Sequence, residues 1–268
     1  MHNTITTQHD LGEVFSKLGL KKGMDVMVHS SLRSLGFVVN GALDVIDSLL
    51  AIIGEEGTLL MPSHTGQLTD PAGWKNPHIS SEYVETVRCC MRPFDSKTTP
   101  IRNRGVIPQT FLTYPDVCRS HHPLNSVTGK GRQAVYYTQT HPLHASEGLE
   151  SPIGKLYERN GYVLLIGVTL ARCTAIHLAE FIADVAYLKK NSLKVLWRGK
   201  DGCNEFVRLE RYPGDSECFD KVRRDIQNKD IFKEIEFGCG KLIFFPIKPV
   251  VNFVVERLKE NEEYLLKP

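Results

Sequence analysis

The sequence lacks a C-x-x-C pair and an excess of charge of either sign. Its seven cysteines are an odd, scattered set in which only Cys89 and Cys90 are neighbours, and this spacing excludes a zinc ribbon and a thioredoxin-like redox motif. We interpret them as reduced thiols. Lys and Arg number 33 against 31 for Asp and Glu, so the overall charge gives no attraction to nucleic acid. An anionic ligand must therefore be bound by a local group of basic residues.

Long apolar runs are also missing. No stretch reaches the roughly 18 apolar residues that cross a bilayer. The first ten residues are polar and do not contain the apolar core of a secretion signal. The sequence therefore predicts a soluble, cytoplasmic protein that acts on neither nucleic acid nor membranes.

The patterns that are present alternate between strand and helix. Hydrophobic residues make up 41% of the 268, which is enough for a substantial core. Apolar runs predict buried strands at residues 26–29, 58–61, 163–166 and 242–245. Helical spacing of apolar residues predicts helices over residues 11–18, 41–53 and 250–258. This alternation is typical of an α/β sheet, and we predict one domain over residues 1–268.

Long loops interrupt this alternation. Residues 63–103 are rich in Pro, Ser, Thr and Asp and contain Trp74, with one short helix predicted near residues 82–91. Two strands joined at residues 199–202 predict a hairpin over residues 193–212. Because long loops in compact domains tend to be functional, we expect loops at about 63–104 and 114–131 to form the ligand cleft.

The most informative stretch is the strand at residues 163–166 and the helix after it, which carries His177 and Glu180. Ligands of open α/β sheets bind beyond the carboxyl ends of the strands, where we expect His177 to lie. Residues three apart share a helix face, so the two side chains can hydrogen-bond or reach one substrate amine together. This is the arrangement of a general base with an orienting carboxylate. A core or capping histidine beside a solvated glutamate is the alternative.

The start of that helix affects the charge of His177. Thr174 is the predicted N-cap, which makes His177 the third residue of the helix. The positive helix end lowers the pKa of the imidazole and the nearby carboxylate raises it. The two effects nearly cancel, which leaves the pKa near its reference value of about 6.5 and suits proton transfer at neutral pH.

Two further segments have the composition of anion-binding loops. His29-Ser-Ser-Leu-Arg-Ser-Leu-Gly36 leaves a strand and precedes a helix, and its small residues and Arg33 suit a phosphate, although the Walker spacing is absent. Downstream, basic residues gather in a region without long helices, at Arg102, Arg104, Arg119, Lys130 and Arg132. A phosphate-rich ligand requires such a group. An ordinary connection and a solvated basic surface are the respective alternatives.

Six segments then stand in a fixed order: Met27-Val-His-Ser-Ser-Leu-Arg-Ser-Leu-Gly36, Gly57-Thr-Leu-Leu-Met-Pro62, Thr99-Pro-Ile-Arg-Asn-Arg-Gly105, Arg119-Ser-His-His-Pro-Leu-Asn-Ser126, Ser151-Pro-Ile-Gly154 and Cys173-Thr-Ala-Ile-His-Leu-Ala-Glu180. In this order they resemble the aminoglycoside 3-N-acetyltransferase family, especially its YokD-type members from Bacillus. The resemblance covers about residues 18–181. It implies a three-layer α/β/α sandwich around a mixed β-sheet, acetyl-coenzyme A (acetyl-CoA) as donor, and antibiotic-resistance chemistry on a primary amine.

The resemblance also implies residue roles. It assigns catalysis to His177 and Glu180, with no metal ion. It assigns coenzyme A (CoA) binding to Ser31, Leu32, Arg33, Ser34, Leu35, Gly36, Phe37, Arg104, Pro123, Ser126 and Val127. The loop between residues 66 and 95 does not align with the antibiotic-binding members, so the acceptor, an aminoglycoside or a related small-molecule amine, stays open.

A mechanism follows from the needs of an amine, which is mostly protonated at neutral pH and must lose a proton before it attacks. We predict direct transfer in which His177 takes that proton and Glu180 orients the imidazole or holds the ammonium. Backbone donors near Ser30 and Ser31 are expected to stabilise the oxyanion of the thioester.

Three alternatives remain open. The first is a CoA-binding protein of the same scaffold with a non-antibiotic acceptor or none. The second is a metal hydrolase that uses His64, His121 or His122 with His177 and Glu180, which lacks the H-E-x-x-H spacing. The third is a nucleophilic Cys173, for which packing is the simpler interpretation.

Overall fold

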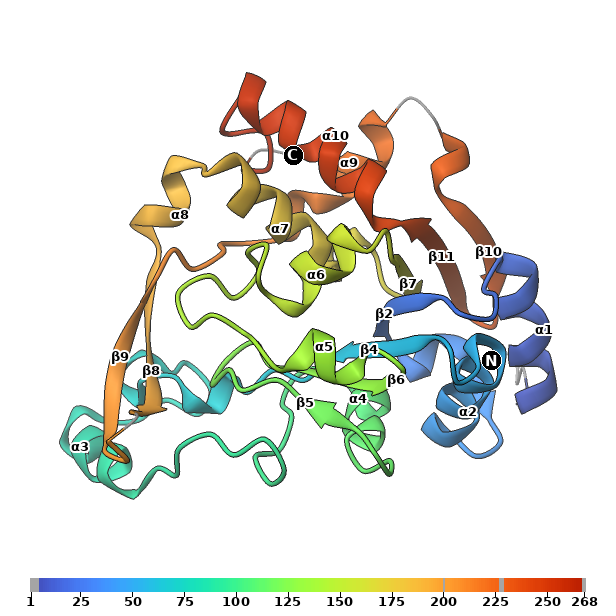
Figure 1. Cartoon of the computed structure of the whole chain (residues 1–268). Coiled ribbons are helices and arrows are strands. Elements are labelled where there is room, and N and C mark those ends of the chain that lie inside the picture. The colour runs from blue at the N-terminus through green and yellow to red at the C-terminus, as the bar shows by residue number, and fades with distance from the viewer. Residues whose placement is uncertain (1–4, 200, 227–228, 267–268) are drawn as a thin grey trace.

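The computed structural model describes residues 5–199, 201–226 and 229–266. Its centre is a seven-stranded sheet between two groups of helices (Figure 1). In spatial order the strands are β10 (Lys233–Phe237), β11 (Gly240–Pro246), β7 (Tyr162–Ile166), β2 (Asp25–Ser30), β4 (Thr58–Pro62), β6 (Val127–Gly131) and β5 (Cys118–Arg119). The three central strands β7, β2 and β4 run parallel, and the outer pairings are antiparallel. The predicted mixed sheet is therefore confirmed.

Side-chain alternation along the central strands builds one hydrophobic core on each face of the sheet. In β2, Val26 and Val28 enter one core and Met27 enters the other. The first core is covered by α1 (Gln8–Leu18), α2 (Ala42–Ile53) and α4 (Val106–Phe111). The second is covered by α5 (Ala134–Thr138), α6 (Pro152–Glu158), α7 (Thr174–Ala183), α9 (Asp220–Asp225) and α10 (Ile247–Glu260). Two helical layers and one sheet make the predicted three-layer sandwich.

The structure corrects the predicted start of α7. Cys173 is the N-cap, and Thr174 is the first residue of the helix. Cys173 makes no side-chain capping bond, while the Thr174 hydroxyl lies 3.4 Å from Nε2 of His29. His177 is therefore the fourth helical residue, one position further from the positive helix end than predicted.

The expected loop at 114–131 contains two strands, β5 and β6. β6 pairs with β4 in antiparallel register from Val127 to Gly131. Its sequence, Val-Thr-Gly-Lys-Gly, has two glycines and no hydrophobic alternation, so local pattern does not predict a strand there. Pairing with the buried strand β4 supplies the order that its own sequence lacks.

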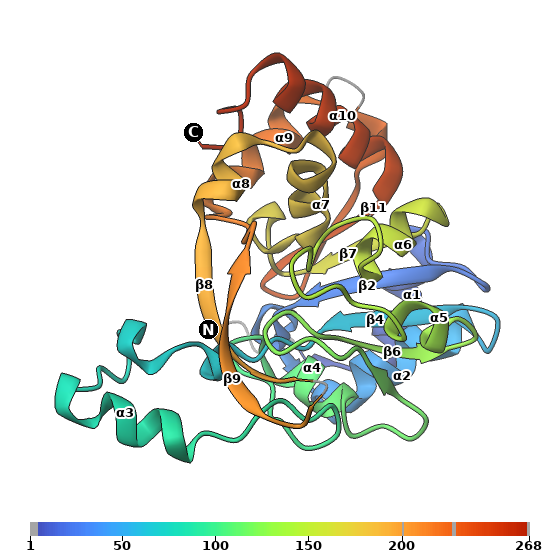
Figure 2. The same cartoon turned by 60° about the vertical axis from the view of Figure 1, so that its left-hand side comes forward.

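The hairpin and the long excursion pack against each other. β8 (Ser192–Arg198) and β9 (Asn204–Glu210) form the predicted hairpin, which runs from α8 (Ala186–Lys190) to the segment that carries α3 (Ser81–Cys90) (Figure 2). The Asp70 amide donates to the Lys194 carbonyl at 3.0 Å. A third hydrophobic cluster joins the two segments, with Leu68, Phe94, Leu124, Val195 and Leu209. The excursion is thus anchored on the hairpin.

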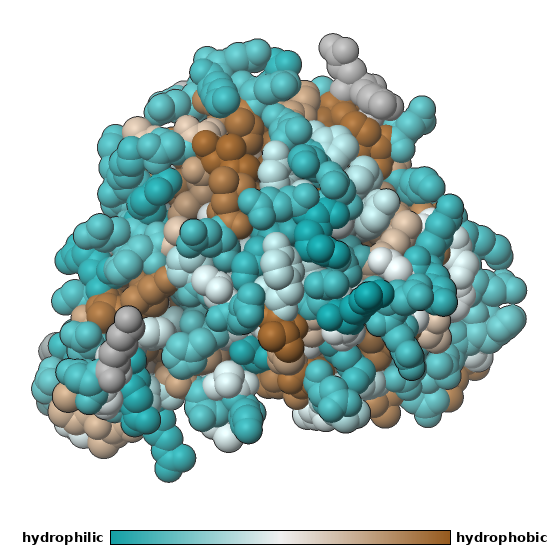
Figure 3. Space-filling view, in the orientation of Figure 1, coloured by the Kyte–Doolittle hydropathy of each residue, from teal (hydrophilic) through white to brown (hydrophobic). Residues whose placement is uncertain are grey.

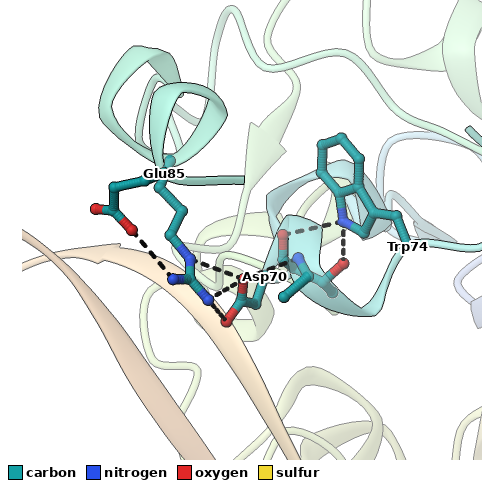
Figure 4. Close-up of polar contacts among 6 residues, drawn as sticks. Asp70, Trp74 and Glu85 are labelled. Carbon is teal, nitrogen blue, oxygen red and sulfur yellow. Dashed lines mark hydrogen bonds and ion pairs between the residues drawn. The ribbon is translucent and has the colours of Figure 1, made fainter. Parts of the chain in front are cut away.

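Polar contacts fix the excursion internally (Figure 4). Two nitrogens of the Arg88 guanidinium, in α3, donate hydrogen bonds to the carboxylate of Asp70 at 2.7–3.0 Å. The third nitrogen donates to the carboxylate of Glu85 at 3.2 Å. The Trp74 indole donates to the carbonyl and hydroxyl of Thr69 at 3.1 and 2.9 Å. A forked Arg–carboxylate contact of this kind restrains orientation as well as distance.

The surface visible in Figure 3 is mainly hydrophilic, with hydrophobic residues in separate patches. Across the described part of the chain, every helix is too short or too polar to traverse a bilayer.

Candidate active site

The carboxyl ends of the three parallel strands meet around a small cavity. His29 lies near the end of β2, Pro62 ends β4, and α7 follows β7. His29 and Pro62 line a cavity of about 160 Å³. Its other lining residues are His64, Arg104, Asn125, Glu147, Ala171, Arg172, Cys173, Thr174, His177, Tyr212, Pro213, Gly214 and Ser216. The position agrees with the general rule for ligand sites of open α/β sheets.

His177 and Glu180 form the predicted pair. Nδ1 of His177 lies 2.6 Å from Oε2 of Glu180, and the hydroxyl of Tyr187 in α8 donates to Oε1 at 2.7 Å. The Glu180 side chain is 1% exposed and does not line the cavity, whereas the His177 side chain is 14% exposed and does. Glu180 is therefore placed behind the imidazole, where it orients the ring.

This hydrogen bond determines which imidazole nitrogen is available. An ionised carboxylate only accepts hydrogen bonds, so in the neutral imidazole Nδ1 carries the proton and Nε2 keeps its lone pair. Burial lowers the pKa of His177, but the charge and hydrogen bond of Glu180 and the charge of Glu147 outweigh it, so the pKa lies above its usual value. The near-cancellation predicted from the sequence is therefore wrong, because the charge and hydrogen bond of Glu180, together with the charge of Glu147, outweigh the effects that lower the pKa.

That second carboxylate, Glu147, was not predicted. It is 3% exposed and lines the cavity, and its two oxygens accept hydrogen bonds from the Asn125 amide and the Ser146 hydroxyl. Burial raises the pKa of Glu147, against the opposing charge of His177 and these two hydrogen bonds. Its sequence surroundings offer no signal, because Asn125 lies 22 positions away in a different loop.

Two more histidines and an arginine complete the wall. The guanidinium of Arg104 contacts Nδ1 of His64. Burial, followed by the charge of Arg104, lowers the pKa of His29 to about 3 and moves the pKa of His64 well below its usual range. Both imidazoles are therefore neutral at physiological pH.

A larger groove adjoins the cavity. It has a volume of about 540 Å³, and the two spaces share His29, Pro62, Arg104 and Arg172 as lining residues. Of the residues predicted to bind CoA, Ser31, Leu32, Arg33 and Arg104 line this groove. Its described lining residues include three arginines and no carboxylate, which suits an anionic ligand.

The remaining residues of the predicted CoA loop point elsewhere. Leu35 is fully buried in the core, Gly36 adopts a φ of 78°, and Phe37 in β3 (Phe37–Val38) is 64% exposed. The Ser34 hydroxyl donates to the Ser31 carbonyl at 2.7 Å. None of these four is among the described residues that line the groove.

In the 123–127 segment, the residues predicted to bind CoA are not the one that lines the cavity. The Pro123 carbonyl accepts from the Thr65 hydroxyl at 2.6 Å, Ser126 is fully buried and donates to the Ser63 carbonyl at 2.6 Å, and Val127 packs in the core at the start of β6. Asn125, between them, is the residue of this segment that reaches the cavity. Tight packing of its neighbours holds it there.

The predicted backbone donor at Ser31 is already engaged, because its N–H donates to the Ile166 carbonyl at 2.8 Å. The Ser30 hydroxyl, in contrast, is buried in the groove wall without a hydrogen-bond partner among the described residues. A side-chain donor at the end of β2 therefore takes the place of the predicted backbone donor as the group available to a ligand.

Of the residues named for the metal hydrolase and for the nucleophilic cysteine, His121, His122 and Cys173 have structural surroundings. His121 packs between the rings of Phe94 and Trp197, at centroid distances of 5.4 and 5.1 Å. His122 accepts from the amides of Leu124 and Asn125 through Nδ1. Over residues 5–199, 201–226 and 229–266, no group of three His, Cys, Asp or Glu side chains is arranged to hold a metal ion. Burial raises the pKa of Cys173 to about 12, which disfavours a thiolate.

Comparison with known proteins places these features in a family. The sequence profile of aminoglycoside 3-N-acetyltransferase matches residues 27–259. The chain is 35% identical to the SPbeta prophage-derived aminoglycoside N(3')-acetyltransferase-like protein YokD of Bacillus subtilis (strain 168), over 97% of this chain and 95% of that protein. The crystal structure of YokD is similar with a TM-score of 0.87 at 33% identity, over 97% and 96% of the two chains.

Two ligand complexes are also similar. One is a binary complex of AAC-IIIb with CoASH, with a TM-score of 0.78 at 25% identity over 96% of this chain and 97% of that one. The other is a mutant of AAC(3)-IVa in complex with a gentamicin, with a TM-score of 0.81 at 27% identity over 100% and 94%. With a profile match over most of its length and 35% identity to a full-length relative, the chain belongs to the aminoglycoside 3-N-acetyltransferase family of acyltransferases.

Proposed function

We propose that the protein transfers an acetyl group from acetyl-CoA directly to a primary amine, with His177 as general base. One observation carries the proposal: an imidazole oriented through Nδ1 by a buried carboxylate lines a cavity that adjoins an arginine-lined groove. The CoASH complex of AAC-IIIb and the gentamicin complex of AAC(3)-IVa support donor and acceptor classes of this kind.

The groove fits the donor in chemistry. Acetyl-CoA combines phosphate groups with a long, mostly neutral arm, and the groove offers Arg33, Arg104 and Arg172 beside the apolar Leu32 and Val106. When bound, acetyl-CoA supplies an activated acetyl group, whose carbonyl carbon forms the new N–C bond as the C–S bond breaks. Arg33, which lines the groove but not the cavity, would bind the phosphates, because guanidinium groups match phosphate oxygens in charge and geometry.

The cavity supplies the base that the amine needs. Nε2 of His177 accepts the proton that the amine loses, and the Glu180 carboxylate stabilises the resulting imidazolium through Nδ1. General base catalysis of this kind typically contributes about 10²–10⁴-fold, and positioning contributes the rest. The deprotonated imidazole is the active form, so kcat/KM should rise with pH through the raised pKa of His177.

The test is the release of free thiol from acetyl-CoA in the presence of candidate amines. His177→Ala should lower kcat at least about 100-fold, because it removes the base. CoA affinity, measured by calorimetry, should stay nearly unchanged. The matched control is His9→Ala on α1, where the exposed His9 also faces a glutamate, Glu13, at 3.5 Å. This control should keep full turnover.

The same measurements separate the alternatives. CoA binding without thiol release for any amine would contradict the transfer reaction and favour a CoA-binding protein. A joint loss of CoA binding and turnover in His177→Ala would assign His177 a structural role. Turnover that stops on exhaustive chelation and returns with a divalent metal would favour the hydrolase.

A further inference from the structure

The cavity beside His177 holds two charged groups of opposite sign that do not pair with each other. Arg104 and Glu147 both line it. Among the described residues, no carboxylate lies within 4.0 Å of the Arg104 guanidinium, and the same holds for Arg172 at the junction with the groove. Arg104 is partly buried, whereas Arg172 is exposed. A partly buried charge without a counter-ion is unfavourable, so a ligand that supplies the missing anion to Arg104 gains affinity.

Arg104 lies between two residues in the left-handed region of backbone conformation. Its neighbours Asn103 and Gly105 have φ values of 58° and 80°, so the chain turns sharply on both sides of Arg104. One guanidinium nitrogen contacts His64, and Nε is buried without a partner among the described residues. Neutral His29 and His64 provide no negative charge, and the guanidinium itself stays protonated. The wall shared with the groove therefore presents a positive charge to the cavity.

Glu147 presents the opposite charge elsewhere in the cavity. Asn125 and Ser146 hold its carboxylate in place, and each carboxylate oxygen retains lone pairs for a further donor. Glu180 cannot take this role, because its two oxygens are occupied by His177 and Tyr187 and it does not line the cavity. Among the described residues that line the cavity, Glu147 is thus the one carboxylate available to an ammonium beside His177.

We propose that the acceptor in the acyl transfer described above is a small amine that also carries an acidic group. Its amine lies between His177 and Glu147, and its oxyanion binds Arg104, with Arg172 at the mouth. The small volume agrees, since about 160 Å³ is below the usual 300–1,000 Å³ of drug-sized ligand pockets. A polycationic aminoglycoside is disfavoured, because its additional ammonium groups would meet Arg104 and Arg172 rather than carboxylates.

The experiment compares matched amines. β-Alanine and aminoethylphosphonate carry an amine and an acid, propylamine carries the amine alone, and putrescine and gentamicin carry additional amines. We expect kcat/KM of at least one acid-bearing amine to exceed that of propylamine, putrescine and gentamicin by about tenfold or more, because the last three leave the guanidinium unpaired. Comparison of β-alanine with aminoethylphosphonate shows whether the site prefers a carboxylate or a phosphonate.

Variants locate the effect. Arg104→Gln should raise KM for the preferred acid-bearing amine about tenfold or more and remove its advantage over propylamine, while CoA affinity by calorimetry changes less than about threefold. Arg102→Gln is the matched control, since Arg102 is an exposed residue of the same loop outside both lining sets. It should leave the preference intact.

Binding of the same amines by calorimetry, in the presence of CoA, keeps this proposal separate from the proposed reaction. Arg104-dependent binding of an acid-bearing amine without thiol release would contradict the acetyl transfer and support the site. A preference for putrescine or gentamicin would overturn the proposal. It would also be overturned if Arg104→Gln weakened CoA binding about tenfold and left the amine preference unchanged, because Arg104 would then serve the donor.

Discussion

Glu180→Gln removes one negative charge behind His177 and keeps the shape of the side chain. The glutamine carbonyl can still accept from Nδ1, and its amide can still meet the Tyr187 hydroxyl, so both hydrogen bonds have replacements. The side chains of His177 and Glu180 are buried or nearly so. Because glutamine has the shape of glutamate, the substitution leaves no cavity. The change therefore tests the charge rather than the packing.

The expected magnitude follows from Coulomb's law. At roughly 4 Å between charge centres and an effective dielectric constant of about 20, imidazolium and carboxylate attract by about 4 kcal/mol. The amide dipole retains part of this, so we expect a loss of roughly 2–3 kcal/mol in the transition state, which lowers kcat by about 30- to 160-fold. The pKa of His177 should fall as well, because Glu180 is the main group that raises it.

The assay is kcat and kcat/KM by thiol release across pH. Since the active imidazole is deprotonated, a lower pKa moves the acid limb of kcat/KM to lower pH even as kcat falls. Tyr187→Phe removes the other hydrogen bond of the Glu180 carboxylate but keeps the charge of that carboxylate. It should therefore lower kcat less, and shift the acid limb of kcat/KM less, than Glu180→Gln does. Equal losses in the two variants, or a limb that stays in place in Glu180→Gln, would refute the assigned role of the charge.

Three further predictions concern other parts of the chain. Cys173→Ala should keep turnover within about fivefold and mass spectrometry should detect no acetyl-enzyme, because a thiol with a pKa of about 12 is not a nucleophile near neutral pH. Gly167→Ala should lower the free energy of unfolding by roughly 1–3 kcal/mol or more in denaturant titrations, since φ is 61° and a Cβ would lie 1.7 Å from Oγ of Ser34. Asp70→Ala should speed proteolysis within residues 63–103. Burial raises the pKa of Asp70, but hydrogen bonding from Arg88 and the other favourable contacts of this carboxylate together outweigh burial and lower the pKa. The wild-type protein should therefore resist proteolysis fully at neutral pH and lose this resistance only in acid, as the carboxyl group is protonated.

The sequence predicted those parts of the fold whose signals are local. The runs at Val26–Val28 and Val163–Ile166 contain no polar alternation, because both faces of these strands are buried, and they became β2 and β7. β6 was missed because its residues carry no such pattern and the strand depends on pairing with β4. The N-cap was placed one residue late because threonine is a good capping residue, yet the Thr174 hydroxyl faces His29 instead.

Some residues of the site are signalled by the local sequence, and others are brought there only by the tertiary structure. His177 and Glu180 were predictable because a spacing of three on a helix places two side chains together whatever the tertiary structure. Glu147 was not, since it reaches the cavity from a loop and is held by Asn125 from another loop. The family resemblance assigned whole segments to CoA binding, whereas only some residues of these segments line the groove, such as Arg33, while others are buried in the core, such as Leu35.

Two carboxylates raise the pKa of one imidazole, and their places in the site differ. Glu180 fixes the tautomer from behind the ring, while Glu147 lies in the wall that a substrate would touch. Both raise the pKa of His177, so a larger share of the imidazole is protonated at neutral pH. That reduces the fraction of His177 that can accept a proton. It also makes the imidazole a stronger base, whose pKa is closer to the value of about 10 for an alkylammonium. The net effect is a site whose proposed activity should increase toward alkaline pH, where imidazole and amine both lose their protons.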